Sequence, residues 1–299
     1  MEKIGLFIVT FISRMPFAVM CVLSDVAAFI LYHIVRYRRA VVRNNLMRCF
    51  PSRSLKEIKK IEKEFYVSFT DVILEIVKSF TISREEIEKR FSIENEEQLR
   101  SYFKDGHDNI MIFGHCFNWE WLMFLKVLMP DMEALALYQR IENHEVNEFM
   151  KKTRQRFGMR VVESRVSLLE LSRLPNSGNT MIAFVADQSP ARTLIKHWVK
   201  LFGQITPAHI GAHDIATRLK FGVVFLYMKR VSRGHYTVCA EKIYTPGDEV
   251  EKYDIIDKFY TRLERQIEEN PTCWLWTHRR WKYEGEYQKV IEKKEKDKK

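Results

Sequence analysis

The sequence lacks the motifs that identify serine hydrolases, metalloenzymes and disulfide-rich secreted proteins. Its five cysteines are scattered through 299 residues and form no Cys-x-x-Cys pair. This argues against a disulfide framework and indicates a reducing compartment. No Gly-x-Ser-x-Gly elbow is present, which disfavours a serine hydrolase. Because no His-Glu-x-x-His motif or His/Cys cluster is present either, we expect no bound metal.

The charge is far from balanced, since 49 Lys and Arg face 39 Asp and Glu and give a net +10. Such a charge indicates an anionic partner, which is a membrane surface, an acidic protein or nucleic acid. No helix-turn-helix, zinc-finger or aromatic RNA-binding pattern accompanies it, so we do not expect nucleic acid. Apolar residues make up 46 % of the chain, which excludes a disordered protein.

One apolar run, 15–35, is about as long as a bilayer-spanning helix. Asp25 lies in its middle and Arg14 just before it, and both are costly at bilayer depth. No small-residue cleavage site follows, so a signal peptide fits poorly. We expect residues 1–40 to anchor the protein or embed in the membrane interface, with the basic stretch on the cytoplasmic side. The alternative is a buried helix of the globular domain. The basic stretch contains Arg36, Arg38, Arg39, Arg43 and Arg48.

From residue 108 onward, short apolar runs alternate with amphipathic segments. The alternation predicts an α/β fold in which helices cover both faces of a sheet and ligands bind where strands end. No repeat or flexible linker interrupts the chain, so we expect one catalytic domain over 41–289 and a charged, solvated tail over 290–299. The expected strands are 110–113, 132–138, 160–162, 181–186, 223–228 and 235–240, and the expected helices in this part are 119–129, 144–157, 167–173, 208–220 and 252–269.

A glycine and then a histidine follow the first of these strands. The run Asn109–Phe113 ends at Gly114-His115, and Glu120 comes five residues after the histidine. Residues five apart do not share a helical face, so His115 and Glu120 meet only if the chain turns between them. Asn118 is a candidate N-cap for a helix that begins there and a candidate residue of a substrate loop. A histidine oriented by a carboxylate is a candidate general base, although a structural histidine is the simpler alternative.

Arginines and polar residues follow other expected strands. Arg140, Arg154 and Arg156 are candidates to bind an oxyanion or a phosphate, with a solvated helix face as the alternative. Asp187 and Gln188 end a buried strand, where they orient either substrate or a turn.

Two further segments are candidate binding elements. Gly203 belongs to a Gly/Pro loop that leads into an expected helix, where an anion can bind; a plain connection is the alternative. Residues 271–282 interleave tryptophans with cations, which suits a membrane interface. A terminal strand or helix packed on the sheet is the other interpretation.

Together these features resemble the late acyltransferases of lipid A biosynthesis, the lauroyl and myristoyl transferases of the lysophospholipid acyltransferase superfamily. The resemblance covers nearly the whole chain. The His-x4-acid motif is typical of the superfamily, and the Trp-x-His-Arg-Arg ending is more specific to this branch. The usual loop reads Gly-His-x-Gly-Asn-Trp-Glu, so Phe117 replaces its second glycine. The resemblance rests on Arg43-Asn-Asn-Leu46, Phe50-Pro51, Gly114-His115, Asn118-Trp119-Glu120, Asp187-Gln188 and Trp276 with His278-Arg279-Arg280.

The resemblance implies a mixed central sheet flanked by helices, similar to glycerol-3-phosphate acyltransferase, behind a hydrophobic N-terminal membrane helix. His115 would remove the proton from an acceptor hydroxyl, with Glu120 holding the imidazole. An arginine, foremost Arg154 or Arg156, would stabilise the oxyanion or bind an acceptor phosphate. The acyl chain would come from an acyl thioester co-substrate, on acyl carrier protein or coenzyme A, without a cofactor. The acceptor would be a lipid A precursor at the cytoplasmic face of the bacterial inner membrane.

Several alternatives stay open at this point. The acceptor is alternatively a lysophospholipid, an aminolipid or a glycolipid. A non-catalytic membrane-binding protein of the same fold would not need His115 or Glu120, and a hydrolase would use the pair to activate water. Cys116, beside the histidine, is the alternative nucleophile, which the resemblance disfavours.

Overall fold

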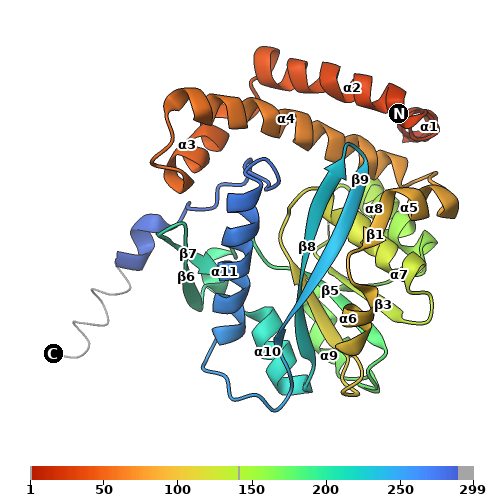
Figure 1. Cartoon of the computed structure of the whole chain (residues 1–299), viewed down its shortest axis with the longest axis vertical. Coiled ribbons are helices and arrows are strands. Elements are labelled where there is room, and N and C mark those ends of the chain that lie inside the picture. The colour runs from red at the N-terminus through yellow and green to blue at the C-terminus, as the bar shows by residue number, and fades with distance from the viewer. Residues whose placement is uncertain (1, 141, 289–299) are drawn as a thin grey trace.

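A seven-stranded mixed sheet forms the centre of the computed structural model, which describes residues 2–140 and 142–288 (Figure 1). The strands lie in the order β1-β9-β8-β2-β5-β3-β4, and neighbours run parallel except for β8 and β9. A second, two-stranded antiparallel sheet pairs β6 with β7. The strands are β1 (Phe91–Ile93), β2 (Asn109–Phe113), β3 (Glu133–Tyr138), β4 (Arg160–Glu163), β5 (Thr180–Val185), β6 (His197–Leu201), β7 (Gln204–Ala208), β8 (Gly222–Ser232) and β9 (His235–Tyr244).

The expected α/β class with a mixed central sheet is confirmed, and the six expected strands correspond to β2, β3, β4, β5, β8 and β9. Three strands were not predicted. β1 has only three residues, and the β6–β7 hairpin carries Pro207 at a position where proline usually indicates a loop. Because a two-stranded sheet consists of edge strands alone, it tolerates a proline that a central strand would not.

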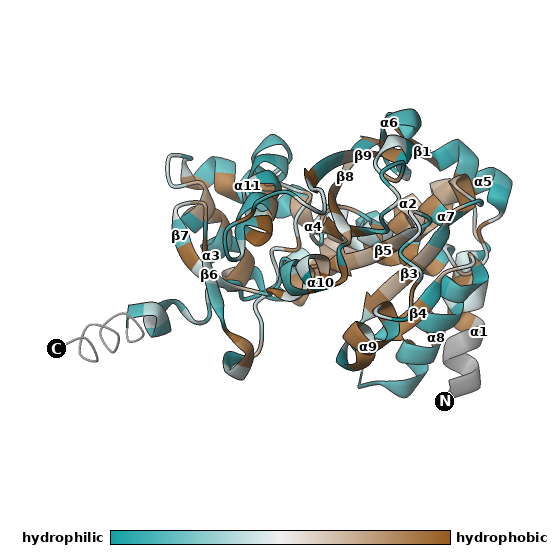
Figure 2. Ribbon diagram, turned by 90° about the horizontal axis from the view of Figure 1, so that it is seen from below, coloured by the Kyte–Doolittle hydropathy of each residue, from teal (hydrophilic) through white to brown (hydrophobic). Residues whose placement is uncertain are grey.

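Helices cover both faces of the sheet and one of its ends (Figure 1). α10 and α11 pack against β2 and β8, whereas α8 and α9 pack against β4 at the far edge. Figure 2 shows apolar residues concentrated on the central strands and polar residues on the outer turns of the helices. The later helices are α5 (Arg84–Arg90), α6 (Glu96–Ser101), a 3-10 helix (Trp119–Phe124), α7 (Leu125–Leu128), α8 (His144–Arg156), α9 (Ser167–Leu171), α10 (Gly211–Leu219) and α11 (Asp254–Glu269).

Four N-terminal helices lie across the end of the sheet: α1 (Glu2–Ser13), α2 (Phe17–Phe29) with a π-helical extension (Ile30–Ile34), α3 (Arg39–Cys49) and α4 (Leu55–Lys78). α4 begins at a capping box in which Ser54 and Glu57 satisfy each other's backbone N–H groups. α2 lies lengthwise on α4 (Figure 1). The helix Phe17–Ile34 is long and apolar enough to span a bilayer, judged by length and composition alone, and 22 % of it is buried.

The carboxyl ends of the parallel strands lie on the side of the N-terminal helices. β2, β5 and β3 are parallel neighbours, so their carboxyl ends share one edge of the sheet. β8 runs parallel to β2, and the turn after β8 reaches α2, where Arg233 binds Asp25 at 2.8 Å. Side chains that follow β2 and β5 therefore gather beneath these helices.

One expectation about membrane contact is wrong. Trp274, Trp276 and Trp281 are buried, so the tryptophan-rich segment packs inside the protein instead of lying in an interface. Part of the basic stretch forms ion pairs within the protein. Glu62, itself fully buried, binds both Arg39 and Arg43. Arg48 pairs with Glu284. Arg36 and Arg38 stay exposed, so contact of the basic stretch with headgroups stays a prediction. The expected tail 290–299 lies outside the described residues.

Candidate active site

His115 lies just beyond β2, after a glycine that packs closely against α11. A Cβ atom added to Gly114 would lie 2.7 Å from Leu263 Cδ1, so this leucine side chain would have to shift to accommodate a larger residue. The imidazole is fixed on three sides. Its Nδ1 lies 2.6 Å from Asp187 Oδ1, and its Nε2 lies 3.3 Å from Gln188 Nε2. The ring of Trp119 packs edge-on against it, with 4.8 Å between the two ring centroids.

The contacts of the imidazole determine which nitrogen carries the proton. An amide nitrogen can only donate, so Gln188 donates to Nε2 of His115, and Nδ1–H donates to the carboxylate of Asp187. Nε2 therefore has the lone pair that a general base needs. Burial lowers the pKa of His115, but the charge and hydrogen bond of Asp187, with the charge of Glu120, outweigh this effect and raise it.

Asp187 lies at the end of β5, the strand next to β2, and is 2 % exposed. Its second oxygen accepts a hydrogen bond from Trp274 Nε1 at 2.7 Å. Burial alone would raise the pKa of this carboxyl group, but the charge and hydrogen bond of His115, together with Trp274, lower it to about 2. Asp187 is therefore ionised at neutral pH and stabilises the protonated imidazole.

The structure places Asp187, not Glu120, on the imidazole, so the expected contact between Glu120 and His115 is wrong. Glu120 instead forms a bidentate ion pair with Arg154, with Oε1 lying 2.7 Å from Nη2. The reason is the local fold. The expected helix 119–129 begins as the tighter 3-10 turn Trp119–Phe124, and this turn directs Glu120 towards α8.

The three candidate arginines have different surroundings in the structure. Arg156 donates to the backbone carbonyls of Ser79 and Ile82, at 2.9 and 2.7 Å, where it ties α8 to the end of α4. Its guanidinium is used within the protein, so the expected oxyanion or phosphate role is wrong for this residue. Arg140 is exposed in the segment after β3, and its role stays a prediction. Arg154 is the arginine that the structure brings to the site.

Asn118 does not cap a helix, which corrects that expectation, whereas its place in a substrate loop stays a prediction. Its side chain makes no capping hydrogen bond; it is fully buried and donates from Nδ2 to Glu75 Oε2 at 2.9 Å. Tyr236 donates to the same carboxylate. Burial raises the pKa of Glu75 to about 7, although these two hydrogen bonds oppose the rise. Through its hydrogen bond with Asn118, Glu75 of α4 therefore fixes the loop between His115 and Glu120.

Phe117 adopts a left-handed backbone conformation, with φ of 49°. This is the position where the related motif usually has glycine, and glycine adopts such angles without cost. The buried ring of Phe117 packs beside Tyr236. The backbone at this position therefore has a φ that suits glycine, and the phenylalanine adds an aromatic side chain to the core. Neighbouring Cys116 is also buried, and burial together with Cys273 raises the pKa of its thiol, which keeps it from acting as a nucleophile at neutral pH.

Gly203 belongs to the turn of the β6–β7 hairpin, which contradicts the expected anion-binding loop. Phe202 and Gly203 both have positive φ, at 51° and 71°, as in the two-residue turns that suit a hairpin. The backbone N–H of Phe202 donates to the carboxylate of Glu264 at 2.7 Å. A negative charge already occupies the position where an anion was expected.

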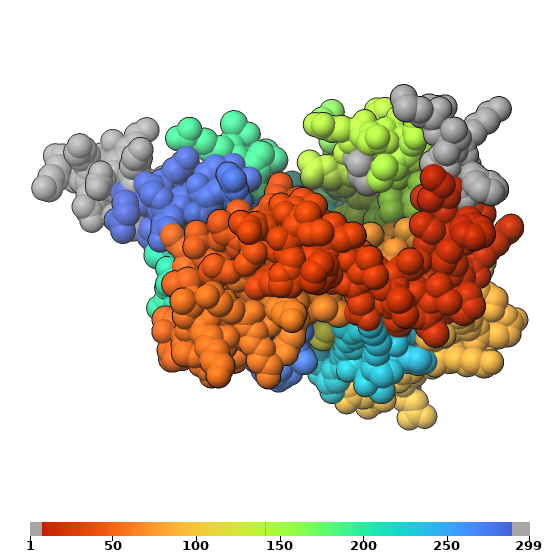
Figure 3. Space-filling model, turned by 90° about the horizontal axis from the view of Figure 1, so that it is seen from above, coloured from red at the N-terminus to blue at the C-terminus, as the bar shows by residue number. Residues whose placement is uncertain are grey.

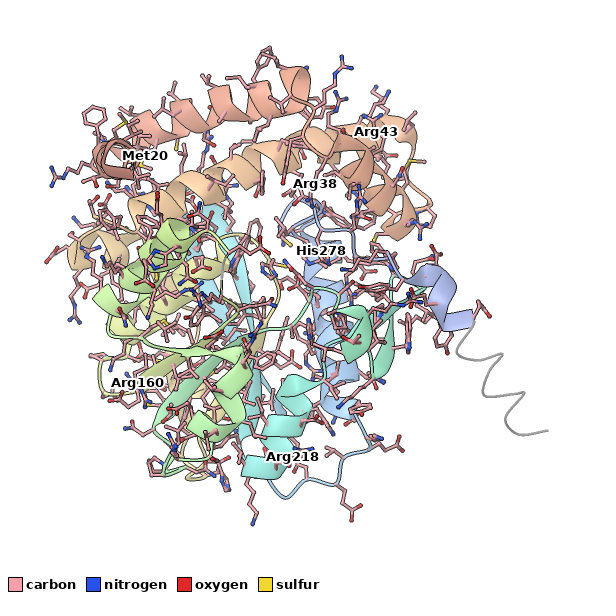
Figure 4. The ribbon with its side chains drawn as sticks, turned by 180° about the vertical axis from the view of Figure 1, so that it is seen from behind. Met20, Arg38, Arg43, Arg160, Arg218 and His278 are labelled. Atoms are coloured by element: carbon pink, nitrogen blue, oxygen red, sulfur yellow. The ribbon has the colours of Figure 1, made fainter. Side chains whose placement is uncertain are left out.

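The C-terminal Trp-x-His-Arg-Arg motif, which we expected at a membrane interface, packs against the loop that carries Asp187 and Gln188. Ser189 N–H donates to His278 Nε2 at 3.1 Å, next to the residue that contacts His115. Burial lowers the pKa of His278 to about 4, so its imidazole is neutral. Arg38 donates to the carbonyl of Thr277, which brings α3 beside this segment (Figure 4).

Arg280, from the same motif, is fully buried and braces the segment that carries Ser189. It donates to Ser189 Oγ, Thr206 Oγ1, the carbonyl of Pro207 and Tyr260 OH. It is held by neutral oxygens alone, so it acts as a scaffold that fixes the 187–189 loop. The motif was visible in the sequence, but its partners lie too far along the chain to be identified there.

A cavity opens beside the ion pair. It opens to solvent, and its walls are mostly apolar. Glu120, Arg154 and Trp119 are among the residues that line it, and Trp119 is the residue that contacts His115. Its remaining walls are Phe113, Leu122, Met123, Ala136, Leu137, Met159, Ala183 and Val185. Within residues 2–140 and 142–288, no three His, Cys, Asp or Glu side chains converge as a metal site.

The site thus combines a buried Asp–His pair at the carboxyl edge of an α/β sheet with an apolar cavity beside it. The model of the bacterial lipid A biosynthesis acyltransferase family matches residues 2–283. The chain therefore belongs to this family and is an acyltransferase. No curated protein matches the sequence.

Proposed function

We propose that this protein is an O-acyltransferase that moves a fatty acyl chain from an acyl thioester to a hydroxyl group of a lipid A precursor. The observation that supports this most is the orientation of His115. Asp187 accepts a 2.6 Å hydrogen bond from Nδ1–H, which keeps the proton on Nδ1 and leaves the lone pair of Nε2 for a substrate hydroxyl. Gln188 covers Nε2 with a single 3.3 Å contact, which a hydroxyl can replace.

In the proposed reaction, Nε2 of His115 takes the hydroxyl proton as the oxygen attacks the thioester carbonyl. The carbonyl π electrons move to oxygen and form a tetrahedral oxyanion. When the carbon–sulfur bond breaks, the thiolate takes the proton from the imidazolium, and the products are an ester and a free thiol. Asp187 stabilises the transient imidazolium and keeps the ring in the productive tautomer.

Arg154 is the proposed donor to the oxyanion. Glu120 holds its guanidinium in a bidentate pair, and both residues line the apolar cavity. A guanidinium fixed in advance stabilises developing negative charge without reorganising during the reaction. The apolar walls of the same cavity suit an acyl chain whose thioester end lies beside Arg154.

The lipid A precursor is proposed as acceptor from the family and from the Trp-x-His-Arg-Arg segment, which packs against the 187–189 loop. A lysophospholipid, aminolipid or glycolipid is the alternative acceptor. The net charge of +10 supports an acidic acyl carrier protein as the donor, with coenzyme A as the alternative. We propose the cytoplasmic face of the bacterial inner membrane as the location, because reduced cysteines and acyl thioesters both belong to the cytoplasm.

Mass spectrometry of total lipids from cells with and without this protein tests the proposal. We expect one lipid A species to lack a single acyl chain in the deleted strain and to regain it when the wild-type gene, but not His115→Ala, is restored. If only phospholipids, aminolipids or glycolipids change, that lipid class is the acceptor and the lipid A assignment is wrong. Restoration by His115→Ala would contradict the mechanism.

A further inference from the structure

We propose that α2 lies in the cytoplasmic leaflet, parallel to the membrane surface, and does not cross the bilayer. The inference rests on the proposed function only in taking the acceptor to be a membrane lipid. α2 presents an apolar side to solvent along its length, and Figure 3 shows α1, α2 and α3 covering one face of the molecule. The apolar side chains exposed on α2 and its extension are Val19, Val22, Leu23, Val26, Phe29, Ile30 and Ile34.

The middle of α2 is bound to the catalytic domain through polar side chains. Ser24 donates to Asp71 Oδ1 at 2.6 Å, and Arg233 bridges Asp25 and Asp71 at 2.8 and 2.7 Å. Asp25 was expected to be costly at bilayer depth, but it is paired with Arg233. Its side chain is 54 % exposed and lies at the border between the apolar side of α2 and the side where Met20, Ser24 and Ala28 are buried.

A helix docked in this way cannot span a bilayer. Spanning would carry Asp25 to the bilayer centre together with Arg233, which belongs to the turn between β8 and β9. An irregular turn is not tolerated in hydrocarbon, because its backbone groups lose their hydrogen bonds. Spanning without the turn would leave Asp25 unpaired and Asp71 buried with one partner fewer, which is also costly.

Both ends of α2 are also hydrogen-bonded to the rest of the domain. Lys78 Nζ donates to the carbonyl of Met15 at 3.0 Å, just before the helix. Arg39 donates to the carbonyl of Tyr32 at 3.1 Å, in the π-helical extension. α4, against which α2 lies, carries an exposed row of lysines on its outer side, at Lys56, Lys59, Lys60 and Lys63. The helix cannot enter hydrocarbon end-on without bringing these charges along.

Cations flank the apolar stretch at both ends. Arg14 precedes α2, and Arg36 and Arg38 follow its extension. All three are exposed, and none forms an ion pair with a carboxylate in the part of the chain that the structure describes. In a spanning helix, Arg14 would lie on the opposite side of the membrane from Arg36, against the preference of cations for the cytoplasm. In a helix lying in one leaflet, all three reach anionic headgroups at one depth.

The same placement brings the catalytic loop to headgroup depth. The ring of Phe17, at the start of α2, lies 6.1 Å from the ring of Trp121, one residue after Glu120. Because the carboxyl ends of β2 and β5 also lie on this side of the molecule, a lipid hydroxyl can reach His115 without leaving the membrane interface.

Cysteine labelling in spheroplasts tests the orientation of the full chain. In a Cys21→Ser background, which removes the least buried native thiol, Arg14→Cys is compared with Lys89→Cys, an exposed position on α5. We expect a membrane-impermeant maleimide to label neither protein in intact spheroplasts and both after permeabilisation. Labelling of Arg14→Cys alone in intact spheroplasts would show that the helix spans, and would overturn the inference.

Vesicle binding tests the embedded side directly. We expect Val22→Ser combined with Phe29→Ser to lower partitioning of the protein onto anionic phospholipid vesicles by about tenfold or more, because buried apolar area drives such binding. Leu169→Ser removes an equally exposed apolar side chain from α9, at the opposite end of the molecule, and should leave binding unchanged. Equal binding by all variants would contradict the inference. Acyl transfer in detergent, measured separately, distinguishes a failure here from a failure of the proposed function.

Discussion

Asp187 Oδ1 lies 2.6 Å from His115 Nδ1, although 72 residues separate them in the chain. The pair exists because β2 and β5 are parallel neighbours in register, so the residues that follow Phe113 and Val185 emerge side by side. This relationship, and not the His-x4-Glu spacing, gives the imidazole its orientation.

Asp187→Asn should lower kcat by about 10²- to 10⁴-fold, with a smaller effect on KM. Trp274 donates to one oxygen of this group, so the asparagine keeps its oxygen there and turns its amide towards His115. The imidazole must then carry its proton on Nε2 and cannot act as a base. Steady-state acyl transfer measures the loss.

A matched control for this substitution exists on the surface. His197 Nε2 and Asp257 Oδ1 form a similar pair at 2.7 Å, away from the site. Asp257→Asn should leave kcat unchanged, and equal losses in the two variants would indicate a general effect on folding.

The rate should rise with pH through a pKa above 6.5, because His115 acts in its neutral form and its pKa is raised by Asp187 and Glu120. Glu120→Gln removes one of these charges, so the ascending limb should move to lower pH. A pH profile of kcat/KM for both proteins measures the shift. An unchanged profile in the variant would show that Glu120 does not act electrostatically on the base.

Arg154 and Arg156 lie on the same helix and should respond oppositely to substitution by lysine. Arg154→Lys breaks the bidentate pair with Glu120 and should lower kcat by about 10²- to 10³-fold, as expected for loss of an oxyanion donor. Arg156→Lys weakens two hydrogen bonds to backbone carbonyls and should cost about 1–2 kcal/mol of stability, with kcat retained. Kinetics and urea unfolding of both variants test the contrast; equal kcat values would remove Arg154 from the mechanism.

Glu75 should make the protein less stable as pH rises. Its pKa is about 7 in the folded state, above the ordinary 4.5, so the folded protein binds more protons than the unfolded chain between these values. Stability is therefore lost as pH rises from 4.5 to 7, by up to about 3 kcal/mol from this group.

Urea unfolding at pH 5 and pH 8 measures the effect of Glu75. Glu75→Gln does not titrate, so its stability relative to the wild type should increase between these two pH values. Tyr236→Phe removes a hydrogen bond that opposes the pKa rise and should steepen the wild-type decline. A constant difference between Glu75→Gln and wild type would contradict the assignment.

Local patterns in the sequence determined most of the fold and part of the site. Apolar runs ending in glycine or polar residues identified β2 and β5, because a buried strand needs apolar side chains on both faces. The same runs ended at His115 and Asp187, so both site residues were visible. The shape of the loop at Phe117 was not predictable, because this residue replaces the usual glycine; the structure shows a buried phenylalanine in the left-handed conformation that costs glycine nothing.

Only the tertiary structure decided which charged groups meet. Spacing favoured Glu120 as the partner of His115, but a 3-10 turn sends that carboxylate to Arg154 on α8. From the sequence, Asp25 was an unpaired charge in an apolar helix, which is costly in a membrane. In the fold, Arg233 from the β8–β9 turn forms an ion pair with it. Ion pairs join side chains that are distant in the chain, and their partners are set by how sheet and helices pack. A single sequence therefore predicts the elements, whereas the pairing of their charges follows from the assembled fold.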